Sequence, residues 1–182
     1  MTCFKWTLLL VVLVGCIPRD RPPVVVVPTP VVKTDDGCVL FWQEGLLVKP
    51  IVKHTGSNLT HAAILLDGYV YEAVPPCVHK VLLKDYVKEM QAKKRKDFKW
   101  FIMEPNKPYT PDELTRMRLN LDSQLGRPYM LRGWWKGHEV RGIFCSQLVG
   151  NALAATGRIK SGNFRESPGS LYEKILPQYT SR

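Results

Sequence analysis

The segment around Asp67 and Gly68 constrains the fold of this chain most strongly. Two apolar runs, Thr60–Leu66 and Tyr69–Val74, stand directly on either side of this dipeptide. Asp-Gly between two such runs is a common β-hairpin connection, because both residues tolerate the positive φ of a tight turn. The chain therefore contains at least one pair of antiparallel strands near its middle, and the other elements must pack around that pair.

Further strands are expected on both sides of the hairpin. Four segments combine apolar, β-branched and aromatic residues and predict strands: Cys38–Trp42, Gly45–Val52, Val78–Leu83 and Lys99–Glu104. Between the last two, Lys84–Lys94 predicts a helix, and the basic run Lys93–Lys99 stands at its exposed end. Such a run is usually a solvated face; the alternative is a patch that attracts an anionic wall polymer or lipid head groups.

The clearest helix is expected over Thr110–Leu125. Thr110 is the N-cap, Pro111 takes the first helical position and Glu113 completes a capping box. Gly126 then supplies a left-handed stop. The apolar residues of this segment recur at helical spacing and form one stripe: Leu114, Met117, Leu121 and Leu125.

A second helix is expected over Cys145–Thr156, which is apolar, rich in small residues and followed by Gly157. A helix of this composition packs closely against a sheet. Together the elements predict an α+β fold for residues 37–182: an antiparallel sheet of about five or six strands, packed against helices on one side. The 45% of apolar residues in the chain suffices for a core of this size.

Residues 1–36 have a different composition and are expected to lie outside this domain. Residues 1–15 carry a lysine before an apolar run, the pattern of a signal peptide, and the run is shorter than the ~18 residues of a membrane span. It ends in Leu13-Val14-Gly15-Cys16, which resembles the lipobox of bacterial lipoproteins, where the cysteine is acylated. An uncleaved anchor or a hydrophobic strand is the alternative. Residues 16–36 hold five prolines and predict a stiff tether, unless Val24–Val27 pairs as an edge strand.

Cys145 carries the strongest chemical signal. It opens an apolar helix directly after Ile143 and Phe144, and a helix N-terminus presents free N–H groups and a partial positive charge. Both lower the pKa of a thiol and favour the nucleophilic thiolate, and the same N–H groups can hold a developing oxyanion. The competing interpretation is an inert cysteine, since free cysteines are commonly buried.

A thiolate needs a base, and a strand would hold His61 rigidly toward a facing helix end. Across the hairpin turn, Glu72 stands among apolar residues, where a carboxylate is costly without a partner. We therefore expect Glu72 to accept a hydrogen bond from the His61 ring and to fix its tautomer. A satisfied core histidine and an outward-facing glutamate are the alternatives. His138 is a second candidate base, with a solvated loop histidine as the simpler interpretation.

Three blocks of sequence together resemble a known family. Leu59–Ile64 with Tyr69–Ala73 is similar to the block that supplies the histidine and the third polar residue. Leu125–Tyr129 looks like the segment ahead of the nucleophile, and Phe144–Val149 like the nucleophile block. That family is the circularly permuted papain-like cysteine hydrolases of the YiiX/YaeF type, in the superfamily of the NlpC cell-wall peptidases. The resemblance covers about residues 37–175 and implies a permuted papain-like (NlpC-like) fold in a bacterial lipoprotein-like precursor.

The resemblance implies a role for each matched residue. Cys145 would be the nucleophile, His61 the general base and Glu72 the group that orients His61. Tyr129 matches a tyrosine that helps to hold the oxyanion in related enzymes. The insert Gly133–Gly142 separates it from Cys145, so a packing tyrosine is an equal alternative.

Four residues outside the matched blocks also have candidate roles. Trp134 and Trp135 are adjacent in the insert and would stack on a sugar or peptide or cover the cleft; buried packing is the alternative. Cys38 and Cys77 form a candidate disulfide if the domain folds outside the cytoplasm. Since the chain has no CxxC and no HExxH motif, no metal and no other cofactor is expected.

These observations predict a membrane-anchored cysteine hydrolase that cleaves amide bonds, and the resemblance implies a cell-wall peptide as substrate. The alternatives are a lipid-directed thiol hydrolase or acyltransferase, and a non-catalytic basic lipoprotein that binds lipid or wall polymer. The net charge of +10 favours an anionic wall polymer or lipid surface as partner, and no nucleic acid is expected. The expected location is the cell envelope, with the domain exported and held by lipidated Cys16, on the periplasmic face of the outer membrane in a Gram-negative cell.

Overall fold

The computed structural model describes residues 35–43, 57–92, 99–131, 141–160 and 166–181. The strands are β1 (Val39–Gln43), β2 (His61–Leu66), β3 (Tyr69–Val74), β4 (Cys77–Leu82), β5 (Lys99–Pro105) and β6 (Tyr179–Ser181). The helices are α2 (Leu83–Ala92), α3 (Pro111–Gln124), α5 (Cys145–Ala155) and α6 (Pro168–Ile175), and a short 3-10 helix, η1 (Leu176–Gln178), follows α6. In this part of the chain no helix has the length and apolar character needed to cross a membrane.

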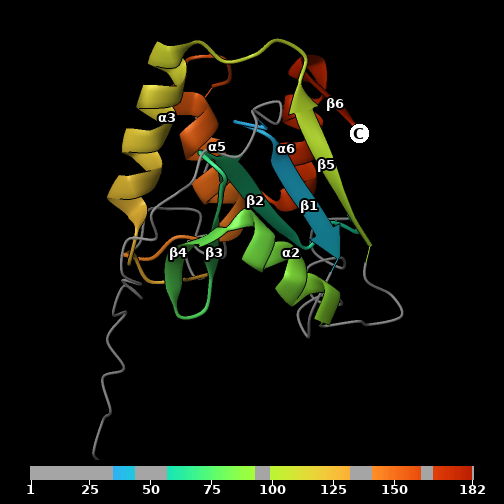
Figure 1. Ribbon diagram of the computed structural model, residues 1–182, viewed down its shortest axis with the longest axis vertical. Helices are drawn as coiled ribbons and strands as arrows, with labels where there is room; N and C mark the ends of the chain where they lie inside the picture. Colours follow the sequence, from blue (N-terminus) through green and yellow to red (C-terminus); the bar gives the residue numbers. More distant parts are fainter. Residues whose placement is uncertain (1–34, 44–56, 93–98, 132–140, 161–165, 182) are drawn as a thin grey trace, which may run out of the picture.

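The strands form one antiparallel sheet in the order β4-β3-β2-β1-β5-β6 (Figure 1). This confirms the predicted α+β class and the antiparallel sheet. The hairpin that joins β2 to β3 turns at Asp67 and Gly68, whose φ angles are 52° and 73°. A turn with two consecutive positive φ angles matches the twist of the strands that it joins.

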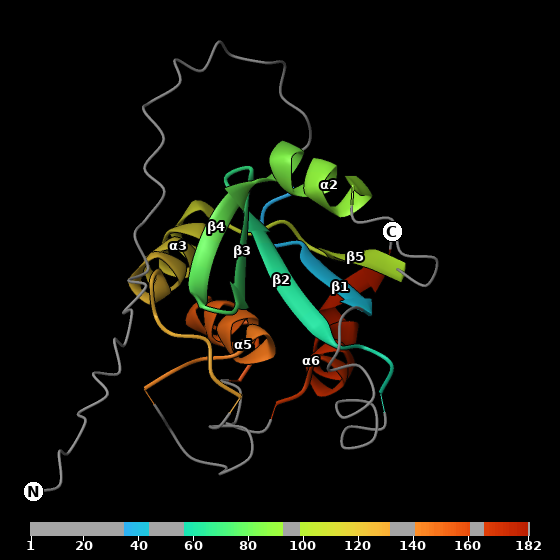
Figure 2. The same cartoon turned by 90° about the horizontal axis from the view of Figure 1, so that it is seen from below.

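The sheet is covered on both faces, which differs from the expectation of helices on one side. α3, α5 and α6 pack on one face, whereas α2 packs on the other (Figures 1 and 2). β2 is buried along its whole length, because its alternate residues enter two different apolar clusters. A continuous apolar run is the pattern of a strand buried on both faces. It does not predict which elements cover each face.

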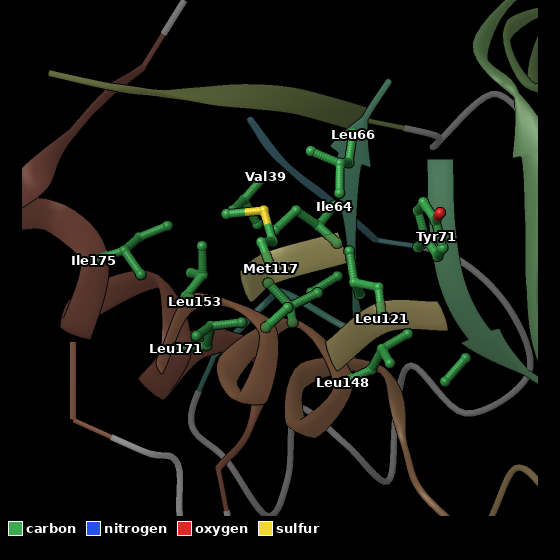
Figure 3. Close-up of a cluster of buried hydrophobic side chains, with 14 of the residues drawn as sticks. Val39, Ile64, Leu66, Tyr71, Met117, Leu121, Leu148, Leu153, Leu171 and Ile175 are labelled. Atoms are coloured by element: carbon green, nitrogen blue, oxygen red, sulfur yellow. The ribbon is translucent and has the colours of Figure 1, made fainter. Parts of the chain in front are cut away.

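The larger cluster lies between the sheet and α3, α5 and α6 (Figure 3). Met117 and Leu121 of α3 and Leu148 of α5 are fully buried there. The predicted stripe of α3 is therefore confirmed at its centre, but Leu125 is 37% exposed because it lies just past the helix end. The predicted capping box is present, with Thr110 as the N-cap.

Three elements after Gly157 were not predicted from the sequence: α6, η1 and β6. α6 begins with a Ser167 cap and Pro168 in its first turn, a start signal that the sequence contains. β6 is only three residues long and pairs with β5, and so short a strand has no periodic pattern. Several predicted segments lie outside the described residues: the signal peptide 1–15, the tether up to residue 34, the strand Gly45–Val52 and most of the basic run Lys93–Lys99.

Candidate active site

The first residue of α5 is Cys145, and it is only 4% exposed. Phe144 takes the N-cap position and makes no side-chain hydrogen bond to the helix start. The N–H groups of the first turn are therefore not engaged by their own cap, and that of Ser146 donates to the Cys145 sulfur. Cys145 therefore opens the helix as expected, at the end where the backbone carries a partial positive charge.

The segment 126–130 links the edge of the sheet to the part of the chain that leads into Cys145. On one side it extends the sheet beyond β4: the N–H of Val78 donates to the carbonyl of Arg127, and that of Tyr129 to Pro76, both at 2.9 Å. On its other side the N–H of Ile143 donates to Pro128, also at 2.9 Å. The chain just before the thiol is thus tied to the edge of the sheet by backbone hydrogen bonds.

His61 begins β2 and lies opposite Trp42 on β1. The two rings are tilted at 60° with centroids 4.2 Å apart, and both residues are at most 9% exposed. The Nε2 of His61 lies 3.1 Å from the Oε2 of Glu72, which is itself 7% exposed. The contact expected between Glu72 and the His61 ring is therefore present.

Cys145 reaches His61 where β2 and β3 separate. His61 lies on the α2 face of the sheet, whereas α5 lies on the other face. The pairing of β2 with β3 ends at Ile64 and Tyr71, so the strands are no longer paired at the level of His61. The thiol makes its hydrogen bond to the His61 ring in this opening. Since Nε2 faces Glu72, the ring nitrogen that remains for the thiol is Nδ1.

The opening between β2 and β3 also provides a backbone N–H that donates to the thiol of Cys145. The N–H of Leu65 donates to Cys38 on β1 at 2.9 Å, and alternation along a strand turns the N–H of Ala62 the other way, toward β3. Because the β2–β3 ladder stops before Ala62, this N–H donates to the Cys145 sulfur instead. Two backbone N–H groups and one imidazole therefore converge on the thiol.

The electrostatics of the three groups favour a charged pair. Burial opposes the imidazolium, but the charge of Cys145 and the hydrogen bonds with Cys145 and Glu72 raise the pKa of His61 to about 10. Burial also opposes the thiolate, yet His61 and the two N–H groups lower the pKa of Cys145. Burial alone would raise the pKa of Glu72, and its two histidine neighbours bring it down to about 2. The arrangement stabilises a thiolate, an imidazolium and a carboxylate together.

Tyr129 lies close enough to the thiol to interact with its charge. Burial first, and then the charge of Cys145, raises the pKa of the Tyr129 hydroxyl, so this group keeps its proton and remains a donor. The hydroxyl of a buried tyrosine beside a thiolate can stabilise negative charge. The structure brings Tyr129 to the Cys145 end of α5 despite the insert between them, while its role stays a prediction.

His79 is a site residue that sequence reasoning missed. It lies directly opposite Glu72 in the pairing of β3 with β4, and its Nε2 is 3.1 Å from the Oε1 of Glu72. The available signal was the two-residue connection Pro75–Pro76, which sets Glu72 opposite His79 once β4 is known to begin at Cys77. Pro-Pro is not a usual hairpin dipeptide, so the register of β4 was not predicted.

The proposed disulfide between Cys38 and Cys77 is wrong. Cys38 is a buried free cysteine. The sheet order places β2 and β3 between β1, which Cys38 directly precedes, and β4, which begins at Cys77. At about 4.8 Å per strand, their Cα atoms are far beyond the ~7 Å that a disulfide spans. Cys16, Trp134, Trp135 and His138 lie outside the described residues, and the roles suggested for them stay predictions.

The site and the topology define a protein of α+β class with a permuted papain-like fold, in which the histidine strand precedes the cysteine helix. Among solved structures, the metalloprotein YiiX from Escherichia coli O157:H7, described with DUF1105, has a similar fold. The TM-score is 0.63 and the identity 18%, over 83% of this chain and 97% of that chain. No protein-family model and no curated protein sequence matches this chain.

YiiX is described as a metalloprotein, which raises the question of whether the residues at the thiol of this chain could hold a metal ion. At the thiol, each oxygen of Glu72 faces a different histidine and the thiol takes the far side of the His61 ring. These groups form a row of hydrogen bonds and do not face a common centre, so they do not fit a metal. Among the described residues the ligand atoms of Asp35, Cys38 and Glu104 do lie within 4.8 Å of one another, at the other end of β1.

Proposed function

We propose that this chain is a cysteine hydrolase that cleaves amide bonds. The observation that carries the proposal is the row of hydrogen bonds from Cys145 through His61 to Glu72, at a helix N-terminus that has no side-chain cap. A nucleophile, a base and a group that orients the base are what thiol catalysis requires. The fold is similar to that of YiiX, and the resemblance of the sequence to the permuted papain-like hydrolases also supports this activity.

In the first half of the reaction, the Cys145 thiolate attacks the carbonyl carbon of an amide. The C–S bond forms and the carbonyl electron pair moves to oxygen, where N–H groups of the α5 N-terminus and the Tyr129 hydroxyl act as donors. As the tetrahedral intermediate collapses, the C–N bond breaks and the His61 imidazolium gives its proton to the leaving amine. The products are a free amine and a thioester on Cys145.

In the second half, His61 is neutral and takes a proton from water. The hydroxide equivalent adds to the thioester carbon, the C–S bond breaks, and a carboxylic acid is released. The proton taken by His61 restores the imidazolium beside the thiolate. Throughout, Glu72 accepts from Nε2 of His61 and keeps Nδ1 directed at the reacting atoms.

For the substrate we propose a peptide of the cell wall. The resemblance to the NlpC superfamily supports this class, and the net charge of +10 suits an anionic wall polymer. The proposed anchor at Cys16 would hold the domain at the envelope, where that polymer is found. Incorporation of labelled palmitate, and its loss in Cys16→Ser, tests the anchor separately from the activity.

The test of the activity uses the full chain and purified wall fragments. Hydrolysis of an amide releases one new amine and one new carboxylate, which mass spectrometry of the fragments locates. We expect release with the native chain and none with Cys145→Ser. Unchanged fragments together with an unreactive Cys145 would contradict the enzymatic proposal and leave a binding lipoprotein.

A lipid-directed thiol hydrolase or acyltransferase is the second candidate, favoured by the positive charge and by the proposed lipid anchor. The same nucleophile would attack an ester carbonyl in place of an amide. Incubation with phospholipid vesicles separates the two: fatty acid release that depends on Cys145, without cleavage of wall fragments, would select the lipid substrate.

A further inference from the structure

Glu72 is held between two histidines. Its Oε2 faces Nε2 of His61 and its Oε1 faces Nε2 of His79, both at 3.1 Å. The Glu72 side chain is 9% exposed, whereas the His79 side chain is 39% exposed. The row of groups therefore runs from the buried thiol outward to a histidine in contact with solvent, and the proposed hydrolysis does not use that last residue.

The hydrogen-bond partners of His79 define its protonation state. Its Nδ1 lies 3.3 Å from the carbonyl oxygen of Cys77, and its Nε2 faces the Glu72 carboxylate. Both partners are acceptors, because a carboxylate with a pKa of about 2 carries no proton. Neutral imidazole has one N–H and imidazolium has two. Only the charged form of His79 can donate in both directions at once.

The charge count of the site gives the same result. The Cys145 thiolate, the His61 imidazolium and the Glu72 carboxylate sum to one negative charge, and all three residues are buried. An uncompensated charge in a buried site is costly. A positive His79 beside Glu72 brings the sum to zero.

We propose that protonated His79 is a positioning residue that holds Glu72 against His61 and balances the charge of the Cys145 thiolate. The proposal rests on the proposed function and extends it to the pH range over which the thiolate persists. His79 touches neither the thiol nor the reacting carbonyl in this arrangement, and it acts through Glu72.

The charged groups around His79 favour the protonated form of its ring. Glu72 on β3, through its hydrogen bond and its charge, and Glu89 on α2 are negative neighbours that raise the pKa of His79, against the effect of partial burial. Beyond β4 the backbone of Arg127 pairs with Val78, and its guanidinium donates to the carbonyls of Arg141 and Gly142. Because the pKa is raised, the balancing charge is fully present below the ordinary histidine pKa of about 6.5 and is lost only as the pH rises through the higher folded value.

The test follows the alkylation rate of Cys145 by iodoacetamide between pH 4 and 10 in the full chain. His79→Gln keeps a donor for Glu72 but removes the charge, whereas His79→Lys keeps a charge that does not titrate over the acid limb of the profile. We expect His79→Gln to move the acid limb of the profile upward by about half a pH unit, with a several-fold slower reaction at low pH. His79→Lys should leave the acid limb within about a tenth of a unit of the native profile.

Two control variants accompany the series. Lys84→Gln removes an equal charge from an exposed position of α2 and should not move the profile, while Cys145→Ser measures background labelling of the other cysteines. If the His79→Gln profile superimposes on the native one, or if His79→Lys shifts as far as His79→Gln, the proposal is wrong.

A second measurement needs no variant. Nitrogen chemical shifts of the His79 ring, followed by NMR as the pH rises, report its protonation directly. We expect an imidazolium at pH 7; a ring that is neutral at pH 7 overturns the proposal. The two proposals fail in different ways, because a native Cys145 that reacts as an ordinary thiol contradicts the hydrolase, whereas a reactive Cys145 that is indifferent to His79 contradicts only this inference.

Discussion

Two buried cysteines in the part of the chain that the structure describes form no disulfide, Cys38 and Cys145, and they lie toward opposite ends of β2 in different electrostatic surroundings. Both are at most 4% exposed. Cys145 has an imidazole and two N–H groups directed at its sulfur. Cys38 precedes β1, and carboxyl oxygens of Asp35 and Glu104 lie within 4.8 Å of its sulfur. Burial is therefore common to both, and the partners of the sulfur make the difference.

The largest effect on hydrolysis is expected when one of these two cysteines is substituted. Cys145→Ser should abolish amide hydrolysis, by at least about 10³-fold, because no thiolate remains to attack. Cys38→Ala should leave turnover within about twofold, since it removes no group from the site. Turnover of wall fragments and mass-spectrometric mapping of iodoacetamide adducts measure both variants. Preferential labelling of Cys38 at neutral pH would contradict the comparison.

The next largest effect concerns the base that Cys38 lacks. His61→Ala should slow hydrolysis by about 10³-fold, because it removes both the proton carrier and the positive charge that stabilises the thiolate. Alkylation of Cys145 should become slower as well and should acquire the pH dependence of an ordinary thiol. The labelling rate of Cys38 in denaturant is the control, and it shows that the chain is intact and that the reagent reaches its cysteines. An unchanged Cys145 profile would show that His61 does not activate it.

A smaller effect is expected from the group that orients the base. Glu72→Gln should lower turnover by about 10- to 100-fold, because the amide holds the His61 ring less firmly and removes a negative charge. That charge raises the pKa of His61, so its loss should move the alkaline limb of the hydrolysis profile to lower pH. This shift is opposite in direction to the upward shift expected from loss of the positive charge of His79. A shift to higher pH in Glu72→Gln would contradict the assigned geometry.

Glu72 also links the site to stability in acid. Its pKa is about 2 in the fold against 4.5 for an ordinary glutamate, so its stabilising effect is complete above pH 4.5 and is lost as the pH falls toward 2. The difference in unfolding free energy between the native chain and Glu72→Gln should thus be constant at neutral pH and should shrink below pH 4.5. Denaturant titrations at a series of pH values measure it.

The smallest effect is expected at Tyr129. Tyr129→Phe should reduce hydrolysis by about tenfold, because one donor to the oxyanion is lost while the N–H groups of α5 remain. Alkylation of Cys145 forms no oxyanion and should change little. Equal losses in both assays would assign Tyr129 to packing around the thiol, the alternative that its partly buried position also allows.

Much of the fold was predictable because its signals are local. The Asp67–Gly68 turn and the capping box at Thr110 depend on residues within a few positions of one another, and both are present as expected. The meeting of His61 and Glu72 was within reach for the same reason, since one hairpin carries both. β6 and the placement of α2 were not predictable, because a three-residue strand has no period and a strand buried on both faces does not say what covers each.

By itself the sequence determined the elements and the chemistry of the individual residues: a cysteine at a helix start, a histidine on a strand and a glutamate across the turn. Only the tertiary structure decided which of these groups meet. It opened β2 from β3 beyond Ile64 so that Cys145 reaches His61, set His79 opposite Glu72, and kept Cys38 apart from Cys77 by two strands. The physical reason is that register and strand order arise from packing between distant segments, and no local pattern encodes them.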